Sequence, residues 1–183
     1  LGKSLVFTLP VVCLDWKAVV FSPLVALMQD QVQGLRRKGI RAAQLSGLQT
    51  EAENDSAMAD WQAGKVQMLY VAPERLANEK FRHAIKCVPP EMVVVDEAHV
   101  ISQWSVNFRH NYMHIGDFIE EFKPKGVGAF TATCPEQVEF DVRKVLRMQH
   151  ARMWKFLPRR KNLHLDSAAF IGYPDLARRT EAV

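Results

Sequence analysis

The chain has 183 residues, of which 48% are hydrophobic, and a formal net charge of +4 at pH 7. This length and apolar content suit a single α/β domain with a sizeable core. The three cysteines (Cys13, Cys87 and Cys134) are far apart and form no Cys-x-x-Cys pair, which argues against a disulfide framework and a zinc site and suggests a reducing compartment. No stretch approaches the roughly 20 apolar residues of a membrane span. The small basic excess is compatible with a polyanionic partner.

Apolar runs alternate with amphipathic stretches along the chain, as in a parallel sheet covered on both faces. A helix is predicted near residues 5–14, and strands at 18–21, 42–45, 67–71, 92–95 and 127–130. Further helices are predicted at 24–37, 51–62, 78–86, 112–122 and 135–146. Thr50 and Glu53 have the spacing of a capping box at the start of one helix, and Pro135 lies near the first turn of another.

Two adjacent carboxylates, Asp96 and Glu97, directly follow the apolar run 92–95. Carboxylates are costly at the end of a buried strand unless a cation needs them. In P-loop nucleotidases the first acid holds Mg²⁺ on the nucleotide and the second polarises the attacking water. The alternative is a strand that ends in a solvated acidic turn.

The chain begins with Leu1-Gly2-Lys3-Ser4, whose last three residues have the pattern of the end of a phosphate-binding loop. In such a loop Lys3 reaches the β- and γ-phosphates, and the Ser4 hydroxyl binds Mg²⁺. Gly-Lys-Ser alone is a weak signal, and its value lies in preceding an acid pair on a later strand. Thr131 and Thr133 follow the predicted strand 127–130, where ordinary turn chemistry is the alternative interpretation.

The ordered motifs of the chain resemble those of superfamily 2 helicases. These motifs are Gly2–Ser4, the stretch from Ser22-Pro23-Leu24 to Gln29-Asp30-Gln31-Val32, the residues 71–76 (Val-Ala-Pro-Glu-Arg-Leu), Asp96-Glu97-Ala98-His99, and Thr131–Thr133. The stretch from 101 to 112, with Ile101-Ser102-Gln103-Trp104, Asn107-Phe108-Arg109 and Tyr112, resembles the aromatic-rich loop of the RecQ DNA helicases. The resemblance extends from residue 1 to about residue 147, and residues 159–163 loosely resemble the entry into the second domain of that family.

The resemblance implies the following roles. ATP phosphates are bound by Gly2, Lys3 and Ser4, Mg²⁺ by Ser4 and Asp96, and water is activated by Glu97. His99 and Gln103 couple the nucleotide to DNA, and Thr131 and Thr133 couple hydrolysis to movement. Single-stranded DNA is contacted by Ser22, Pro23 and Arg75 and sensed by Trp104, Phe108 and Arg109. Aromatic faces stack on any base and arginine attracts phosphate, which suits a sensor.

The chain also departs from the RecQ pattern. Ser105-Val106-Asn107 replaces the usual Gly-His-Asp, His110-Asn111 replaces Pro-Asp or Pro-Glu, and Leu1 replaces a glycine. We expect residues 1–147 to form an N-terminally truncated first RecA-like domain, and residues 148–183 a basic linker and the start of a truncated second domain or an unassigned tail. The second RecA-like domain would supply an arginine finger, so we expect this chain alone to be nearly inactive.

The sequence therefore predicts an α/β fold: a three-layer RecA-like P-loop domain with a mostly parallel sheet covered by helices on both faces. The resemblance implies an ATP- and Mg²⁺-dependent 3′-to-5′ DNA helicase motor of DNA repair and recombination, acting on single-stranded and duplex DNA. Such a protein is expected inside the cell, in the cytoplasm of a prokaryote or the nucleus of a eukaryote, without a membrane. The alternatives are a catalytically dead remnant that binds DNA or a protein partner, and another superfamily 2 motor such as an RNA helicase.

Alanine at Trp104 tests whether this residue senses DNA or packs in the core. A core tryptophan would leave a cavity and cost about 3–5 kcal/mol of unfolding free energy. We expect instead little change in melting temperature and, in the enzyme completed with its second domain, loss of DNA-stimulated ATPase, because stacking on a base is worth about 1–3 kcal/mol. Thermal denaturation beside DNA-stimulated ATPase decides, with Trp154→Ala as a control outside the motif. Strong destabilisation with stimulation retained would contradict the sensor assignment.

Overall fold

The computed structural model describes residues 2–102 and 110–156. Residues 1–151 form one compact unit, and a second unit starts at residue 152. In the described part of the second unit the Arg152 guanidinium lies 4.1 Å from the centroid of the Trp154 ring. The predicted domain boundary at residue 147 stays a prediction.

A five-stranded sheet in the order β2-β3-β1-β4-β5 forms the centre of the first unit. Its strands are β1 (Ala18–Phe21), β2 (Ala42–Leu45), β3 (Met68–Val71), β4 (Met92–Val95) and β5 (Gly126–Ala129), and every neighbouring pair is parallel. Three strands have the predicted bounds, β3 starts one residue later than predicted, and β5 is shifted by one residue. The predicted parallel sheet is confirmed.

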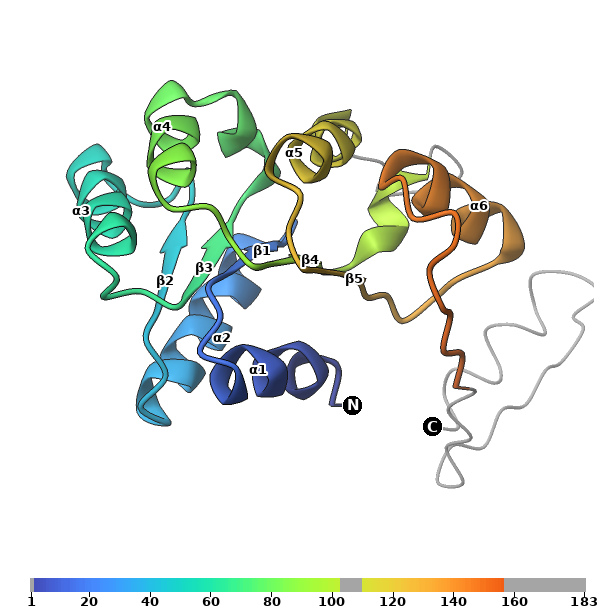
Figure 1. Ribbon diagram of the computed structural model, residues 1–183, viewed down its shortest axis with the longest axis horizontal. Helices are drawn as coiled ribbons and strands as arrows, with labels where there is room; N and C mark the ends of the chain where they lie inside the picture. The colour runs from blue at the N-terminus through green and yellow to red at the C-terminus, as the bar shows by residue number, and fades with distance from the viewer. Residues whose placement is uncertain (1, 103–109, 157–183) are drawn as a thin grey trace, which may run out of the picture. The chain divides into compact units, whose positions relative to one another are not determined.

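Helices cover both faces of this sheet (Figure 1). One face carries α1 (Lys3–Cys13) and α2 (Val25–Arg37), and the other carries α3 (Glu51–Gln62), α4 (Glu79–Cys87) and α5 (Ile115–Phe122). The last helix, α6 (Glu136–Val145), lies beside α5, and its residues Val142 and Val145 pack against the same core. The three-layer arrangement expected from the sequence is confirmed.

The alternation of side chains along each strand divides the core in two. In β1, Val19 and Phe21 belong to the core under α3, α4 and α5, whereas Ala18 and Val20 belong to the core under α1 and α2. All four residues are completely buried. Successive side chains of a strand point to opposite faces, so a strand covered on both faces is apolar throughout. This explains the continuous apolar runs in the sequence.

Aromatic packing closes the core under α4 and α5. The Phe118 ring of α5 contacts Phe21 edge to face at 5.2 Å between centroids, stacks at 6.1 Å on Phe81 of α4, and lies 4.6 Å from Phe122. Offset and edge-to-face pairs of this kind add to the free energy gained from burial alone. Phe118 therefore joins the sheet to two helices.

The structure confirms the predicted start of one helix and shifts the predicted start of another. The capping box at Thr50 and Glu53 is confirmed, with each residue's side chain accepting a hydrogen bond from the other's backbone N–H. The helix predicted from residue 112 begins only at Ile115, because residues His110–His114 form a 3₁₀ turn (η3). Tyr112 in this turn is fully buried, and its hydroxyl bonds to the backbone oxygen of Asp96 at the end of β4.

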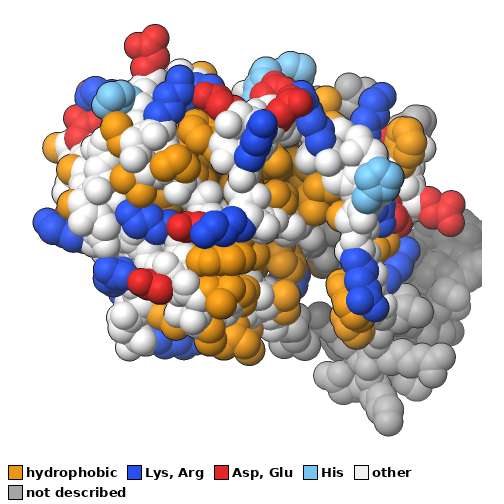
Figure 2. Space-filling view, in the orientation of Figure 1, with side chains coloured by type: hydrophobic (Ala, Val, Ile, Leu, Met, Phe, Trp, Pro, Cys, Tyr) orange, Lys and Arg blue, Asp and Glu red, His pale blue; other side chains and the backbone are white. Residues whose placement is uncertain are grey.

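The outer face of α1 is apolar. Leu5, Val6 and Leu9 are between 56% and 63% exposed, and hydrophobic side chains gather over this helix in the space-filling view (Figure 2). The helix therefore lacks the polar outer face of an ordinary surface helix. No helix within residues 2–102 and 110–156 is both long enough and apolar enough to cross a membrane.

Alanine at Phe118 tests the aromatic core. Phe118 is 1% exposed, so the variant should lose about 3–5 kcal/mol of unfolding free energy through the cavity it leaves. The matched control is Phe140→Ala on α6, where the ring is 60% exposed and the loss should stay below about 0.5 kcal/mol. Urea denaturation followed by circular dichroism measures both. Equal losses for the two variants would contradict this packing.

Candidate active site

An ion pair joins the start of α1 to the end of β4. Nζ of Lys3 lies 2.7 Å from Oε1 of Glu97 and 4.0 Å from Oδ1 of Asp96, although the two segments are more than ninety residues apart in the sequence. Gly2, which caps the helix, has a φ of 87°, a left-handed conformation that glycine adopts without steric cost. The fold thus brings the predicted phosphate-loop lysine and both predicted acids to one place.

The Asp96 carboxylate is buried at the end of its strand. The residue is 4% exposed, and Oδ1 accepts a hydrogen bond from the backbone N–H of Glu97 at 3.0 Å. Burial raises the pKa of Asp96 above its ordinary value, and the Glu97 N–H and the Lys3 charge oppose this rise only in part. Burial also raises the pKa of the Tyr70 hydroxyl on β3, and the negative charge of Asp96 adds to this rise. The positive charge near Asp96 is therefore too small to offset the burial of its carboxylate.

The backbone of Glu97 is left-handed, with φ 48° and ψ 44°. This conformation is uncommon for residues other than glycine, asparagine and aspartate, and costs of order 1–3 kcal/mol. It turns the chain sharply after β4 into the 3₁₀ turn η2 (Ala98–Ile101). The Glu97 carboxylate is thereby presented to Lys3 on one side and to His99 on the other, with 3.3 Å between its Oε2 and Nδ1 of His99.

His99 connects the acid pair to the end of β5. Its Nδ1 lies 3.0 Å from Oγ1 of Thr131, which also donates a hydrogen bond to the backbone oxygen of Thr133 at 2.9 Å. The Thr131 hydroxyl in turn accepts a hydrogen bond from the Thr133 N–H at 3.3 Å. The structure therefore links His99, Thr131 and Thr133, which the sequence assigned to coupling, in one chain of contacts with Glu97.

The residues assigned to DNA contact lie at the carboxyl ends of β1 and β3. Ser22 and Pro23 are both buried. Arg75 is half-buried in the 3₁₀ turn η1 (Pro73–Ala77) and donates from Nη2 to the backbone oxygen of Ser46 at 2.6 Å. All of these assignments stay predictions.

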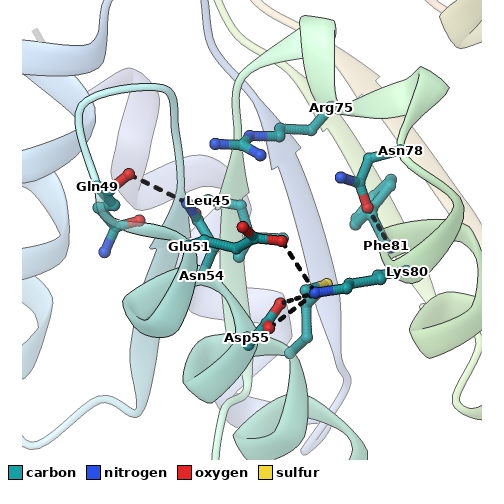
Figure 3. A pocket seen from close by; sticks show the side chains of 10 residues that line it. Leu45, Gln49, Glu51, Asn54, Asp55, Arg75, Asn78, Lys80 and Phe81 are labelled. Atoms are coloured by element: carbon teal, nitrogen blue, oxygen red, sulfur yellow. Dashed lines mark hydrogen bonds and ion pairs between the residues drawn. The ribbon is translucent and has the colours of Figure 1, made fainter.

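Arg75 also lines a cavity of about 250 Å³ between α3 and α4 (Figure 3). On the wall of this cavity Lys80 forms ion pairs with Glu51 and Asp55, at 3.1 and 2.8 Å. Lys80 offsets only one of these two negative charges, and among the described residues 2–102 and 110–156 Arg75 forms no ion pair.

The remaining predicted residues, Gln103, Trp104, Phe108 and Arg109, lie outside the described residues. Described residues on either side of residues 103–109 form hydrogen bonds to α6 and to the backbone of the acid pair. Ser102 donates from its hydroxyl to Oδ2 of Asp141 on α6 at 2.5 Å, and the Tyr112 hydroxyl donates to the backbone oxygen of Asp96 at 3.4 Å. Sequence reasoning missed the contact of Asp141, because this residue lies in an amphipathic helix whose alternation of apolar and polar residues gives no signal of it.

The oxygen donors of the site suit Mg²⁺. The Ser4 hydroxyl is exposed at the start of α1, and the Asp96 carboxylate faces the same lysine that a phosphate group would contact. Mg²⁺ usually takes one or two protein oxygens and completes its shell with phosphate oxygens and water. In the part of the chain that the structure describes, no group of three or more histidine, cysteine, aspartate or glutamate residues could hold a metal on its own. The donor set therefore fits a metal brought with a nucleotide.

Comparison with known proteins gives consistent results. The sequence profile described as "DEAD/DEAH box helicase" matches residues 1–140. The "ATP-dependent DNA helicase RecQ" of Pasteurella multocida is 35% identical over 153 residues, which is 84% of this chain and 24% of that protein. The "Probable ATP-dependent DNA helicase RecS" of Bacillus subtilis is 34% identical over 181 residues, 98% of this chain and 34% of that protein. The chain thus spans about a quarter to a third of the length of these relatives.

Solved structures share the fold. A "hypothetical ATP-dependent RNA helicase" from Sulfolobus tokodaii superposes with a TM-score of 0.63 at 21% identity, covering 79% of this chain and 42% of that one. The Pyrococcus furiosus Hef helicase domain superposes with a TM-score of 0.60 at 19% identity, covering 80% and 32%. At these identities the likeness concerns the fold alone.

The raised pKa of Asp96 gives a test in the absence of nucleotide. Because the folded state binds this proton more tightly than the unfolded state, stability is lost as the pH rises from the ordinary carboxyl pKa of about 4 through the raised value. An asparagine side chain has no charge to bury, so Asp96→Asn should raise the melting temperature at pH 7, and the gain should shrink as the pH falls toward 4.

Melting curves of the chain between pH 4 and pH 8 measure this effect. Asp30→Asn, at an exposed aspartate on α2, is the control and should leave the curve unchanged. A lower melting temperature for Asp96→Asn at pH 7 would mean that contacts of the ionised carboxylate outweigh the cost of its burial.

Proposed function

The chain belongs to the DEAD/DEAH box helicase family and is related to RecQ-type DNA helicases, and we propose that it is the first motor domain of such a helicase. In this role it couples Mg²⁺-dependent ATP hydrolysis to 3′-to-5′ movement along DNA, in repair or recombination inside the cell. The observation that carries the proposal is the Lys3 ammonium, 2.7 Å from Glu97 and 4.0 Å from Asp96. A lysine and two acids at the carboxyl end of a parallel sheet are the groups that P-loop motors use for phosphoryl transfer.

Each residue of the site has a role in this reaction. Lys3 exchanges its contact with Glu97 for the γ-phosphate and stabilises the negative charge that spreads over it. The Ser4 hydroxyl and the Asp96 carboxylate hold Mg²⁺, which supplies further charge neutralisation when bound. Glu97, released from Lys3, orients the attacking water and accepts its proton. The exchange of partners keeps the acid inactive until a nucleotide enters.

Contacts at the same site carry the coupling to DNA. His99 lies between Glu97 and Thr131, so a shift of the β5 end changes the position of the acid. Residues 103–109 lie between Ser102 and Tyr112, whose hydroxyls bond Asp141 and the Asp96 backbone. DNA bound by Trp104, Phe108 and Arg109 would act on the acid pair through these bonds, and Arg75 would hold a phosphate of the same strand.

The reaction also needs a group that residues 1–147 do not supply under this proposal. In this class of motor an arginine from outside the phosphate site stabilises the transition state and is worth about 10³–10⁵ in rate. We infer that a second RecA-like domain provides it in the complete helicase, and that the 183-residue chain hydrolyses ATP only slowly.

Two alternatives have distinct signatures. A catalytically dead module is favoured by Ser105-Val106-Asn107, which replaces residues usual in the RecQ aromatic loop. Such a module would bind DNA without Lys3-dependent hydrolysis. An RNA-directed motor would be stimulated by RNA at least as strongly as by DNA, and the Ser102-Gln103-Trp104 pattern with Phe108-Arg109 speaks against it.

Substitutions at Lys3 and Glu97 test the proposal in the full-length protein. Lys3→Ala should abolish ATP hydrolysis, because the phosphate loses its lysine contact. Glu97→Gln should bind ATP and fail to hydrolyse it, because the shape is kept and the carboxylate is lost. Steady-state ATPase and binding of a fluorescent ATP analogue measure both steps, with Lys65→Ala, at an exposed lysine, as control. ATPase of Glu97→Gln within about twofold of the unchanged protein would refute the role of Glu97.

A further inference from the structure

The η2 turn is bound along its whole length to one continuous segment, residues 130–141. At its start the Ala98 N–H donates to the backbone oxygen of Phe130 at 2.9 Å. In its middle Nδ1 of His99 lies 3.0 Å from Oγ1 of Thr131. At its end Ser102, the C-cap residue, donates its hydroxyl to Asp141 at 2.5 Å. The first two contacts extend the pairing of β4 with β5, whereas the third comes from α6.

The Ser102–Asp141 bond has the features of a strong contact. Ser102 is completely buried, and a buried hydroxyl without a partner would cost about 1–3 kcal/mol. An O–H donor bound to an ionised carboxylate at this length forms a charge-assisted bond, roughly twice as strong as a neutral one. The second oxygen of Asp141 accepts from Nε2 of Gln137 at 3.2 Å, one turn earlier on α6. Both carboxylate oxygens are thus held, which fixes the rotamer that reaches Ser102.

The position of Asp141 differs from that of an ordinary surface carboxylate. Val138, one turn before it, is 6% exposed and belongs to the packed side of α6, whereas Phe140 beside it is 60% exposed. Asp141 therefore lies at the edge of the buried face, where a polar side chain can reach a buried partner on the neighbouring turn. No residue of the proposed ATP chemistry contacts it within residues 2–102 and 110–156.

We propose that Asp141 is a positioning residue that, through Ser102, fixes η2 and hence His99 against α6. The proposal rests on the proposed ATPase function and identifies how that site is coupled to DNA. With both ends of the turn attached to residues 130–141, a movement of this segment carries His99 and the Glu97 carboxylate with it. Without Asp141 the end of the turn that leads to residue 103 loses its hydrogen bond to α6 and follows this helix less closely, although Val100 and Ile101 stay packed in the core.

The test compares variants of Asp141 and of its partner Ser102 in the full-length protein. Asp141→Ala and Ser102→Ala should each lower DNA-stimulated ATPase about fivefold or more, the lower end of typical coupling between two sites. ATPase without DNA and the KM for ATP should stay within about twofold, because neither residue contacts the nucleotide site. Asp141→Asn should restore most of the stimulation, since its amide oxygen still accepts the Ser102 hydroxyl. The double variant should lose no more than either single one.

Val138→Ala is the matched control for stability. It removes buried methyl groups from the same helix and should lower the melting temperature, yet leave DNA stimulation intact. A second readout uses the 183-residue chain itself, in which Asp141→Ala but not Val138→Ala should speed hydrogen exchange of the amides of residues 98–102.

The outcomes separate this proposal from the proposed function. If the unchanged protein has no hydrolysis that depends on Lys3, the proposed function fails. If it has such hydrolysis and Asp141→Ala keeps its DNA stimulation, the role of Asp141 fails alone. Equal loss of stimulation in Asp141→Ala and Val138→Ala, or unchanged exchange of residues 98–102 in Asp141→Ala, would also overturn it.

Discussion

The ion pair between Lys3 and the two acids after β4 is the interaction on which the site depends. A buried carboxylate such as Asp96 costs free energy that its own strand cannot recover, and the compensating charge comes from Lys3, near the start of the described sequence. Both groups meet because the parallel strands end at one edge of the sheet and α1 begins at that edge. The acid pair, the turn that follows it and the end of β5 then form one connected group of polar contacts.

Local patterns in the sequence predicted most of the architecture. The apolar runs of β1, β2 and β4 were placed at their observed bounds because strands buried on both faces have few polar positions. The start of β5 was missed by one residue because Gly126 and Gly128 weaken the apolar signal. Residues 112–114 of the 3₁₀ turn were predicted as the start of a helix, since their apolar spacing resembles a first helical turn. Contacts such as Ser102 with Asp141 have no local signature, because each partner looks ordinary within its own element.

Fold and function rest on different observations in this protein. Solved structures at 19–21% identity share the layers and the sheet, including one whose title names an RNA helicase. Relatives at 34–35% identity are named as DNA helicases, and this chain covers only part of their length. A scaffold common to many motors does not select the nucleic acid. Under the proposed function that choice lies with residues 103–109 and with the bonds of Ser102 and Tyr112 on either side.

Under the proposed function, the left-handed backbone of Glu97 lowers thermal stability at a residue whose carboxylate is needed for turnover. Glycine or asparagine would adopt the same conformation at lower cost, and either would remove the carboxylate. A laboratory selection for heat resistance alone would therefore drift toward glycine or asparagine at this position and yield sturdier, inert proteins. A selection for growth that requires the motor would keep glutamate and accept the lost stability. The amino acid found at position 97 in the selected variants would thus show whether selection had acted on heat resistance or on motor activity.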